Sequence, residues 1–262
     1  MRKHKKLIVT VTLVCVLLLV VGGSLSAFLL GGGGAEIDLA YSQSPGEVII
    51  QVESGGGPPP LWEDYIPEFR LFGDGTVIKR DPQTNKVFML QGKMGPADVE
   101  NLLKQIKDAG FFDLQAHYGN DQIYDGSYTV ITVRVASGQK QVLVYMTQVA
   151  AFANVHEAIT SAPLSGLVDY LPPEGYLMVQ PYRGGDVAVL EPGTEAYAAL
   201  PDMAALLAAD YRTPVPVSGN NFLELKKFEG QQKYIGMVVH TGTGDLEVFP
   251  VYVPRTIAVG YN

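Results

Sequence analysis

Cysteine is almost absent from this chain of 262 residues, because the only one, Cys15, lies in the apolar N-terminal segment. The residues that follow this segment can therefore form no disulfide and no zinc–thiolate site, and they contain no cysteine nucleophile. Avoidance of cysteine suits an exported protein that folds without oxidative help. Stability must come from apolar burial, for which a hydrophobic content of 47% is ordinary.

Histidine is also scarce, with only His117, His156 and His240 beyond the N-terminal segment, at separations that match no metal-ligand spacing. His156-Glu157 begins like the His-Glu-x-x-His zinc helix, but Thr160 occupies the position of the second histidine. The Gly-x-Ser-x-Gly elbow, the phosphate-binding loop and the Gly-x-Gly-x-x-Gly turn are absent. The sequence therefore predicts no catalytic residue, cofactor or metal centre, and we interpret each histidine as a surface or polar-capping residue.

Positive charge is scarce after the first six residues. The chain has 19 Lys and Arg residues against 27 Asp and Glu residues, and four of the basic ones precede position 7: Arg2, Lys3, Lys5 and Lys6. The rest of the chain carries 15 basic and 27 acidic residues, a balance of about −12. Because nucleic acids are bound mainly by neutralising their phosphates with Lys and Arg, we expect no nucleic-acid partner.

The N-terminal segment consists of a basic flank, residues 1–6, and an apolar run, residues 7–30, that contains no charged residue. As a helix, those 24 positions would span about 36 Å, more than the roughly 30 Å hydrocarbon core of a bilayer. The positive-inside rule then places the flank in the cytoplasm and the acidic globular region from about residue 36 onward, the body, outside. The sequence predicts a single-pass anchor whose partner is the lipid bilayer.

A cleaved signal peptide is the alternative, and it would leave a secreted protein. Leu7 to Val21 has the length of a signal core, and Ser24 and Ser26 could serve a peptidase, but Phe28 to Leu30 extends the apolar run and favours an uncleaved anchor. Lipidation is not expected, because Cys15 lies in the middle of the run rather than after small residues at its end.

The body predicts an α+β fold, with antiparallel sheets covered on one face by amphipathic helices. The clearest helix is Pro96 to Ala109, whose apolar positions recur at helical spacing: Val99, Leu102, Leu103 and Ile106. A second helix is expected at Val149 to Thr160, through Phe152, Val155 and Ile159. The runs around Gly73-Asp74-Gly75 and around Ser137-Gly138 predict two hairpins. At least part of the second hairpin has apolar residues on both faces, so we expect it to lie centrally in its sheet.

The other expected elements are less periodic. Strands are predicted at Glu47–Glu53, Tyr176–Pro181, Asp186–Leu190, Phe222–Phe228, Tyr234–His240 and Leu246–Val253, and an alanine-rich helix at Tyr197–Ala209. The predicted organisation is a flank (1–6), an anchor (7–30), a glycine-rich tether (31–45), an α+β domain (46–171) and a second α+β region (172–262). Pro172-Pro173 is the candidate junction, and the second region could also continue the first sheet.

The most polar stretch, Tyr118 to Ser127, is the one candidate for a metal site. Asn120, Asp121 and Asp125 could offer the oxygen ligands that calcium prefers. Their spacing does not match an EF-hand loop, and Asx-rich turns are common before strands, so a structural turn is the favoured interpretation.

The order of elements resembles a family of exported, membrane- or lipid-anchored bacterial envelope proteins of uncharacterised function. The resemblance lies in a strand ending in Glu, a long Gly/Pro loop, PEFRLFGDGTVI, a helix leading to AGFFDL, and a hairpin, over residues 46–147. The stretch Tyr211 to Leu225 is loosely similar to a tail motif of such proteins. The resemblance implies a bacterial source and an envelope location, and it supplies no catalytic residues.

These observations predict a membrane-anchored, extracytoplasmic binding or protein-interaction module of the bacterial envelope, which could have an envelope protein as its partner. Two alternatives stay open. One is an envelope enzyme that uses a pair of carboxylates, which needs no sequence motif. The other is an accessory or sensor subunit of a membrane complex, paired through its span.

Overall fold

The computed structural model describes residues 36–56, 66–81, 88–119, 122–123, 126–210, 212–233 and 235–252. Within them, the chain forms two sheets rich in antiparallel pairs and five α-helices, so the α+β prediction is confirmed. The predicted anchor at 7–30 and the tether up to residue 35 lie outside the described residues. No helix in the described ranges is long and apolar enough to cross a membrane.

The first sheet has eight strands in the order β5-β7-β6-β1-β2-β3-β4-β8. All neighbouring pairs are antiparallel except β5 and β7, which are parallel. The strands are β1 (Val48–Gly55), β2 (Phe69–Phe72), β3 (Thr76–Arg80), β4 (Met89–Lys93), β5 (His117–Gly119), β6 (Tyr128–Val135), β7 (Gly138–Tyr145) and β8 (Ser165–Asp169).

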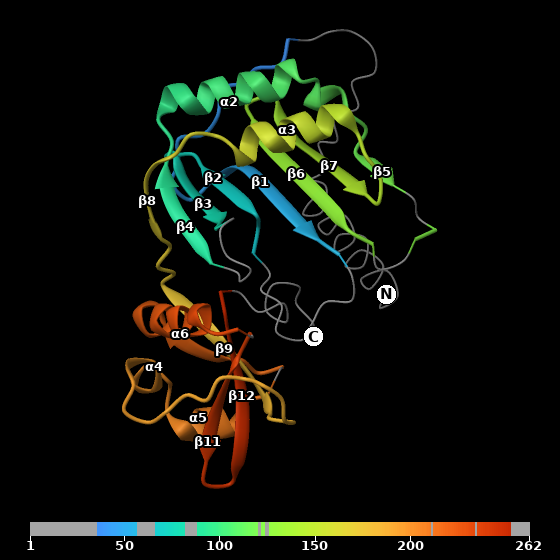
Figure 1. Cartoon of the computed structure of the whole chain (residues 1–262). Helices are drawn as coiled ribbons and strands as arrows, with labels where there is room; N and C mark the ends of the chain where they lie inside the picture. Colours follow the sequence, from blue (N-terminus) through green and yellow to red (C-terminus); the bar gives the residue numbers. More distant parts are fainter. Residues whose placement is uncertain are drawn as a thin grey trace, which may run out of the picture.

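Two helices, α2 (Pro96–Asp108) and α3 (Ala150–Thr160), cover one face of this sheet (Figure 1). Proline at the start of α2 fits its first turn, and Gly110, at φ 79°, follows its last. The residues predicted to face the core are buried in both helices: Val99, Leu102, Leu103, Ile106, Phe152, Val155 and Ile159. Phe111, in the 3-10 turn η1 (Phe111–Asp113), closes the same core, which confirms the predicted packing.

Both predicted hairpins of the first sheet are confirmed, as β2–β3 and β6–β7. Gly75 is required in the first turn, because its φ is 81° and a Cβ there would lie 2.3 Å from the carbonyl oxygen of Met94. Strand β6 is an interior strand, as expected. Its second face is buried only at Val130, because Thr132 and Arg134 on that face are half-exposed.

The second sheet has four antiparallel strands in the order β10-β9-β12-β11. Its elements are β9 (Glu174–Pro181), α4 (Glu195–Ala198), α5 (Met203–Ala208), β10 (Val215–Ser218), α6 (Gly219–Gln231), β11 (Met237–Thr241) and β12 (Gly244–Val251). Helix α6 packs on β9, β10 and β12. The strand predicted at 176–181 is confirmed within β9, the one predicted at 246–253 is observed as β12, which ends at Val251, and the one predicted at 234–240 is observed as β11.

Three predictions in this region are wrong. The strand predicted at Phe222–Phe228 is part of α6, because Phe222, Leu225 and Glu229 are buried at helical spacing rather than in alternation. The strand predicted at Asp186–Leu190 is reduced to a single bridge between Val189 and Val238.

The helix predicted at Tyr197–Ala209 is divided into α4 and α5. The division falls at Pro201, since the residue before a proline is disfavoured in helical geometry. Asp202 then accepts a hydrogen bond from the Ala204 N–H at 3.2 Å and caps a new helix.

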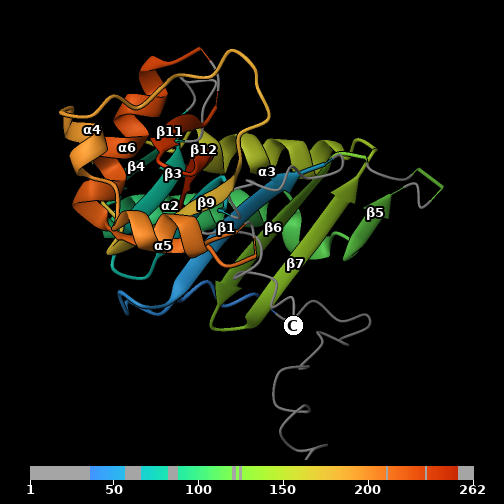
Figure 2. The same cartoon turned by 90° about the horizontal axis from the view of Figure 1, so that it is seen from below.

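The strands of the first sheet end at Asp169 and those of the second begin at Glu174, on either side of Pro172-Pro173. Figure 2 shows the second sheet and its helices beside β3 and β4, far from β5. Met89 of β4 belongs to the buried cluster of the second sheet, and Ile66, Ile78 and Tyr170 pack against that cluster. The outer face of the first sheet, opposite α2 and α3, therefore contacts the second unit.

Candidate functional site

Polar side chains replace the apolar row of the first sheet where β1 ends and β6 begins. Ile50 and Val52 are buried core residues of β1, and Ser54 continues their alternation. Ser54 pairs in register with Thr129, which occupies the corresponding position of β6. The core of the first sheet therefore ends at two hydroxyl groups that lie side by side.

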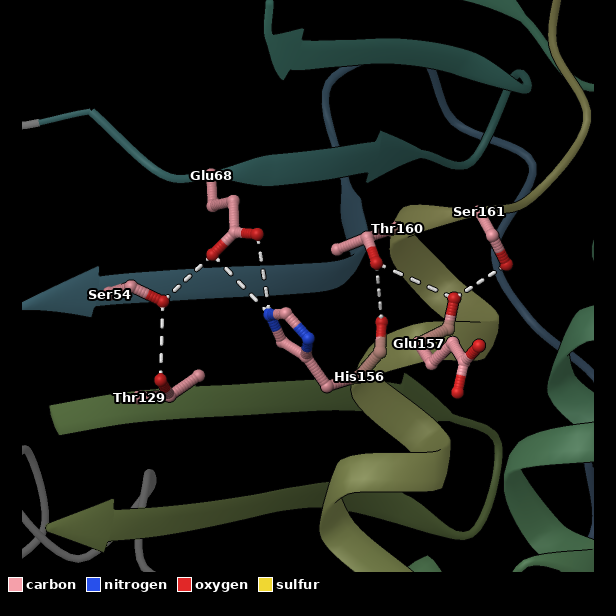
Figure 3. Close-up of polar contacts among 7 residues, drawn as sticks. All are labelled: Ser54, Glu68, Thr129, His156, Glu157, Thr160 and Ser161. Carbon is pink, nitrogen blue, oxygen red and sulfur yellow. Dashed lines mark hydrogen bonds and ion pairs between the residues drawn. The ribbon is translucent and has the colours of Figure 1, made fainter. Parts of the chain in front are cut away.

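These hydroxyls belong to a network with Glu68 and His156 (Figure 3). Ser54 Oγ donates to Glu68 Oε2 at 2.8 Å and lies 3.3 Å from Thr129 Oγ1. His156 Nε2, from α3, lies 3.3 Å from Glu68 Oε1 and 3.4 Å from Oε2. The side chains of His156 and Glu68 are 32% and 29% exposed, so solvent reaches both partners.

Each partner of this pair shifts the other toward its charged form. The hydrogen bond that His156 donates to Glu68 raises the pKa of His156, and partial burial opposes this only in part. The hydrogen bond from His156 lowers the pKa of Glu68, aided by the Ser54 hydroxyl and by the charges of His156 and Arg80 and opposed by burial. The imidazole therefore stays protonated to higher pH than a free histidine, beside an ionised carboxylate.

The order of the hydrogen bonds does not make this network a nucleophilic triad. In such a triad the imidazole accepts the proton of the serine hydroxyl, and the carboxylate orients the imidazole from its far side. Here the Ser54 hydroxyl donates to the carboxylate itself, and His156 presents Nε2 to that same carboxylate. The arrangement can donate hydrogen bonds and carry charge, but it does not activate Ser54.

Thr160, which stands where the His-Glu-x-x-His motif would have its second histidine, bonds to the backbone of α3. Thr160 Oγ1 donates to the His156 carbonyl oxygen at 2.9 Å, and Ser161 Oγ donates to the Glu157 carbonyl oxygen at 2.6 Å (Figure 3). These are local bonds at the end of α3. Across the described ranges no three His, Cys, Asp or Glu side chains gather as metal ligands.

An open groove of about 900 Å³ adjoins the network, and His156 and Thr129 belong to both. Its apolar part includes Val144 and Phe152, and its other hydrogen-bonding side chains come from the ends of β6 and β7 and from the turn before α3: Ser127, Tyr128, Thr147 and Gln148. Ala153 is an exposed residue of the groove wall. A mixed apolar and polar lining of this kind can bind a ligand and fix its orientation.

The other two histidines lie away from the groove lining. His117 is exposed on β5. His240 Nδ1 lies 2.8 Å from Asp245 Oδ1 across the β11–β12 hairpin, and this hydrogen bond raises the pKa of His240. Both are surface residues, as predicted.

The calcium interpretation of Asn120, Asp121 and Asp125 falls on residues outside the described ranges and stays a prediction. The described residues beside them make turn-like contacts with Tyr145. Tyr145 Oη accepts from the Gly126 N–H at 2.8 Å and donates to the Ile123 carbonyl oxygen at 2.6 Å.

The sequence rules out a zinc helix at His156 and predicts a surface or polar-capping residue there, and it does not point to Glu68, Ser54 or Thr129. These residues come from four separate parts of the chain, and they are brought together by the pairing of β1 with β2 and β6 and by the packing of α3 on the sheet. One usable signal was a hydroxyl residue at an inward position at the end of an apolar strand.

Comparisons of the chain with models of protein families, with curated proteins and with solved structures give no match. The resemblance to bacterial envelope proteins therefore stays a prediction.

Proposed function

We propose that this chain is a membrane-anchored, extracytoplasmic binding module of the bacterial envelope, held at the bilayer by residues 7–30. The location is supported by the uncharged apolar run, by the basic flank that precedes it and by the acidic body that follows it. The envelope resemblance over residues 46–147 agrees with this placement.

The groove beside His156 is the observation that carries the binding role. It is open, it has the volume of a ligand or side-chain site, and it combines Val144 and Phe152 with several hydrogen-bonding groups. At one end of it lies His156, whose pKa is raised by its hydrogen bond with Glu68, so that the pair adds charged hydrogen-bonding groups there when the imidazole is protonated. We propose that the groove receives an exposed segment of another envelope protein.

The alternative of an enzyme with a carboxylate pair has less support. Such an enzyme needs two carboxylates that converge in a cleft. The charged groups that act on Glu68 are His156 and Arg80, which are both basic. Exposed apolar side chains along β8 and just after it, at Leu167, Val168 and Leu171, also favour a role in binding.

Photo-crosslinking in living cells tests the groove. A benzophenone amino acid in place of Gln148, which is exposed at the groove, should give a discrete protein adduct, whereas the same residue in place of Gln105, exposed on α2, should not. Ala153→Arg should reduce the adduct by about tenfold or more, because a long charged side chain would fill the groove without reaching the core.

Asn154→Arg is the matched control, since Asn154 is the next residue on α3, is exposed and does not line the groove. It should leave the adduct unchanged. Equal adducts from Gln148 and Gln105, or equal losses in the two arginine variants, would contradict the proposed groove.

A further inference from the structure

A second pocket, of about 290 Å³, lies between the outer face of the first sheet and the second unit. Its walls are largely apolar and aromatic, and they are formed by Ile66, Ile78, Met89, Tyr170, Tyr176 and Tyr252. Pro172-Pro173, the junction between the strands of the two sheets, forms part of the same wall. Junctions between packed units are a common place for small-molecule sites.

Packing and hydrogen bonds hold the aromatic wall in place. Tyr252 stacks on Tyr170 with ring centroids 6.1 Å apart, and it meets Phe222 of α6 edge-on at 4.8 Å. Tyr252 Oη accepts a hydrogen bond from the Met89 N–H at 3.2 Å, which ties the wall to β4. The pocket is therefore preformed, and a ligand would not have to order these side chains on binding.

Among the described residues of its lining, the cationic group is the half-buried guanidinium of Arg70 on β2. Its Nε donates to Gln51 Oε1 at 2.9 Å, and its terminal nitrogens have no hydrogen-bond acceptor among the residues that the structure describes. Burial lowers the pKa of Arg70, opposed by the charge of Glu53 and by Tyr170, but an arginine stays protonated. A partly desolvated charge with donors of this kind gains from an anionic partner.

The acidic residue of the pocket, Glu174, is placed differently. It is exposed at the rim, and its hydrogen bond with the Tyr176 hydroxyl raises the pKa of Tyr176. Its charge is therefore hydrated and already has a partner, whereas Arg70 is half-buried and lines a pocket with largely apolar walls. The electrostatics favour an anion inside the pocket over a cation.

We propose that this pocket binds a small carboxylic acid with an aromatic or branched aliphatic body. The apolar body would pack against Tyr170, Tyr252 and Met89, and the carboxylate would pair with the terminal nitrogens of Arg70. A planar carboxylate matches the fork of donors that a guanidinium presents. The groove beside His156 plays no part in this site.

Three probes of similar shape test the proposal on the full chain in detergent: 3-phenylpropionate, 3-phenyl-1-propanol and 3-phenylpropylamine. Ligand-observed NMR titrations should give saturable binding of the acid, with the alcohol and the amine weaker by about tenfold or more, because a charge-assisted hydrogen bond is lost. Preference for the amine, equal affinities, or no saturable binding of the acid at millimolar concentration would overturn the proposal.

Variants locate the binding. Arg70→Met should lower the affinity for 3-phenylpropionate by about tenfold or more, and Arg70→Lys should restore part of the lost affinity. Arg183→Met removes the same charge from an exposed loop residue outside the pocket lining and should change nothing. Ile78→Trp should lower the affinity for all three probes, because the larger side chain narrows the pocket. Unchanged affinity in Arg70→Met, with a melting temperature like that of Arg183→Met, would also overturn it.

Discussion

Glu229→Ala should lower the free energy of unfolding by about 3–5 kcal/mol, because it removes a buried carboxylate that pairs with the buried ammonium group of Lys226. Glu229 Oε2 lies 3.1 Å from Lys226 Nζ, and the two side chains are 2% and 4% exposed. Glu229 Oε1 also accepts from the Gly236 N–H at 3.0 Å, so the substitution removes the acceptor that joins α6 to the turn before β11. Urea denaturation of the detergent-solubilised chain, followed by circular dichroism, measures the change.

An exposed pair on the same helix provides the control. Glu224 Oε1 lies 2.9 Å from Lys227 Nζ at the same sequence spacing, but both side chains are open to solvent. Glu224→Ala should therefore cost less than about 1 kcal/mol. Similar losses from the two substitutions would show that the Lys226–Glu229 pair is not buried as described.

Leu102→Ala should lower the free energy of unfolding by about 2–5 kcal/mol, the usual range for a leucine truncated in a packed core. Leu102 lies on the buried face of α2, is 3% exposed and belongs to the cluster formed with the first sheet. The same denaturation experiment measures it. Leu207→Ala, on α5, is the matched control, since Leu207 is 47% exposed and should lose less than about 0.5 kcal/mol.

A loss below about 0.5 kcal/mol for Leu102→Ala would place that residue on the surface and rotate the buried face of α2. A loss for Leu207→Ala as large as that for Leu102→Ala would show that exposure does not decide the cost.

The first sheet was largely predictable where the chain has a clear period. Helices α2 and α3 repeat apolar residues at helical spacing, and the β2–β3 and β6–β7 hairpins have glycine at their turns. Helix α6 was not predictable in the same way, because Phe222 and Leu225 lie in a run of mixed residues. Its buried face also includes Lys226 and Glu229, which a hydrophobic pattern counts as exposed.

Short strands were missed for a related reason. Strand β8 has no buried residue, and β5 is only three residues long, so neither shows an alternation of buried and exposed positions. Each is a strand because it pairs with a neighbour, β4 or β7, which local sequence does not encode. The residues around His156 and the pocket beside Arg70 likewise depend on strand order and on the packing of two units.

Labelling of a single cysteine tests most directly whether the body lies outside the cytoplasm, as we propose. With Cys15 changed to Ser, the chain has no cysteine, so Lys104→Cys, at an exposed position of α2, creates one reactive site in the body. A membrane-impermeant maleimide added to intact, wall-stripped cells should label this cysteine fully. Lys3→Cys, in the same background, should react only after lysis. Labelling of Lys3→Cys in intact cells, with Lys104→Cys protected until lysis, would contradict the account.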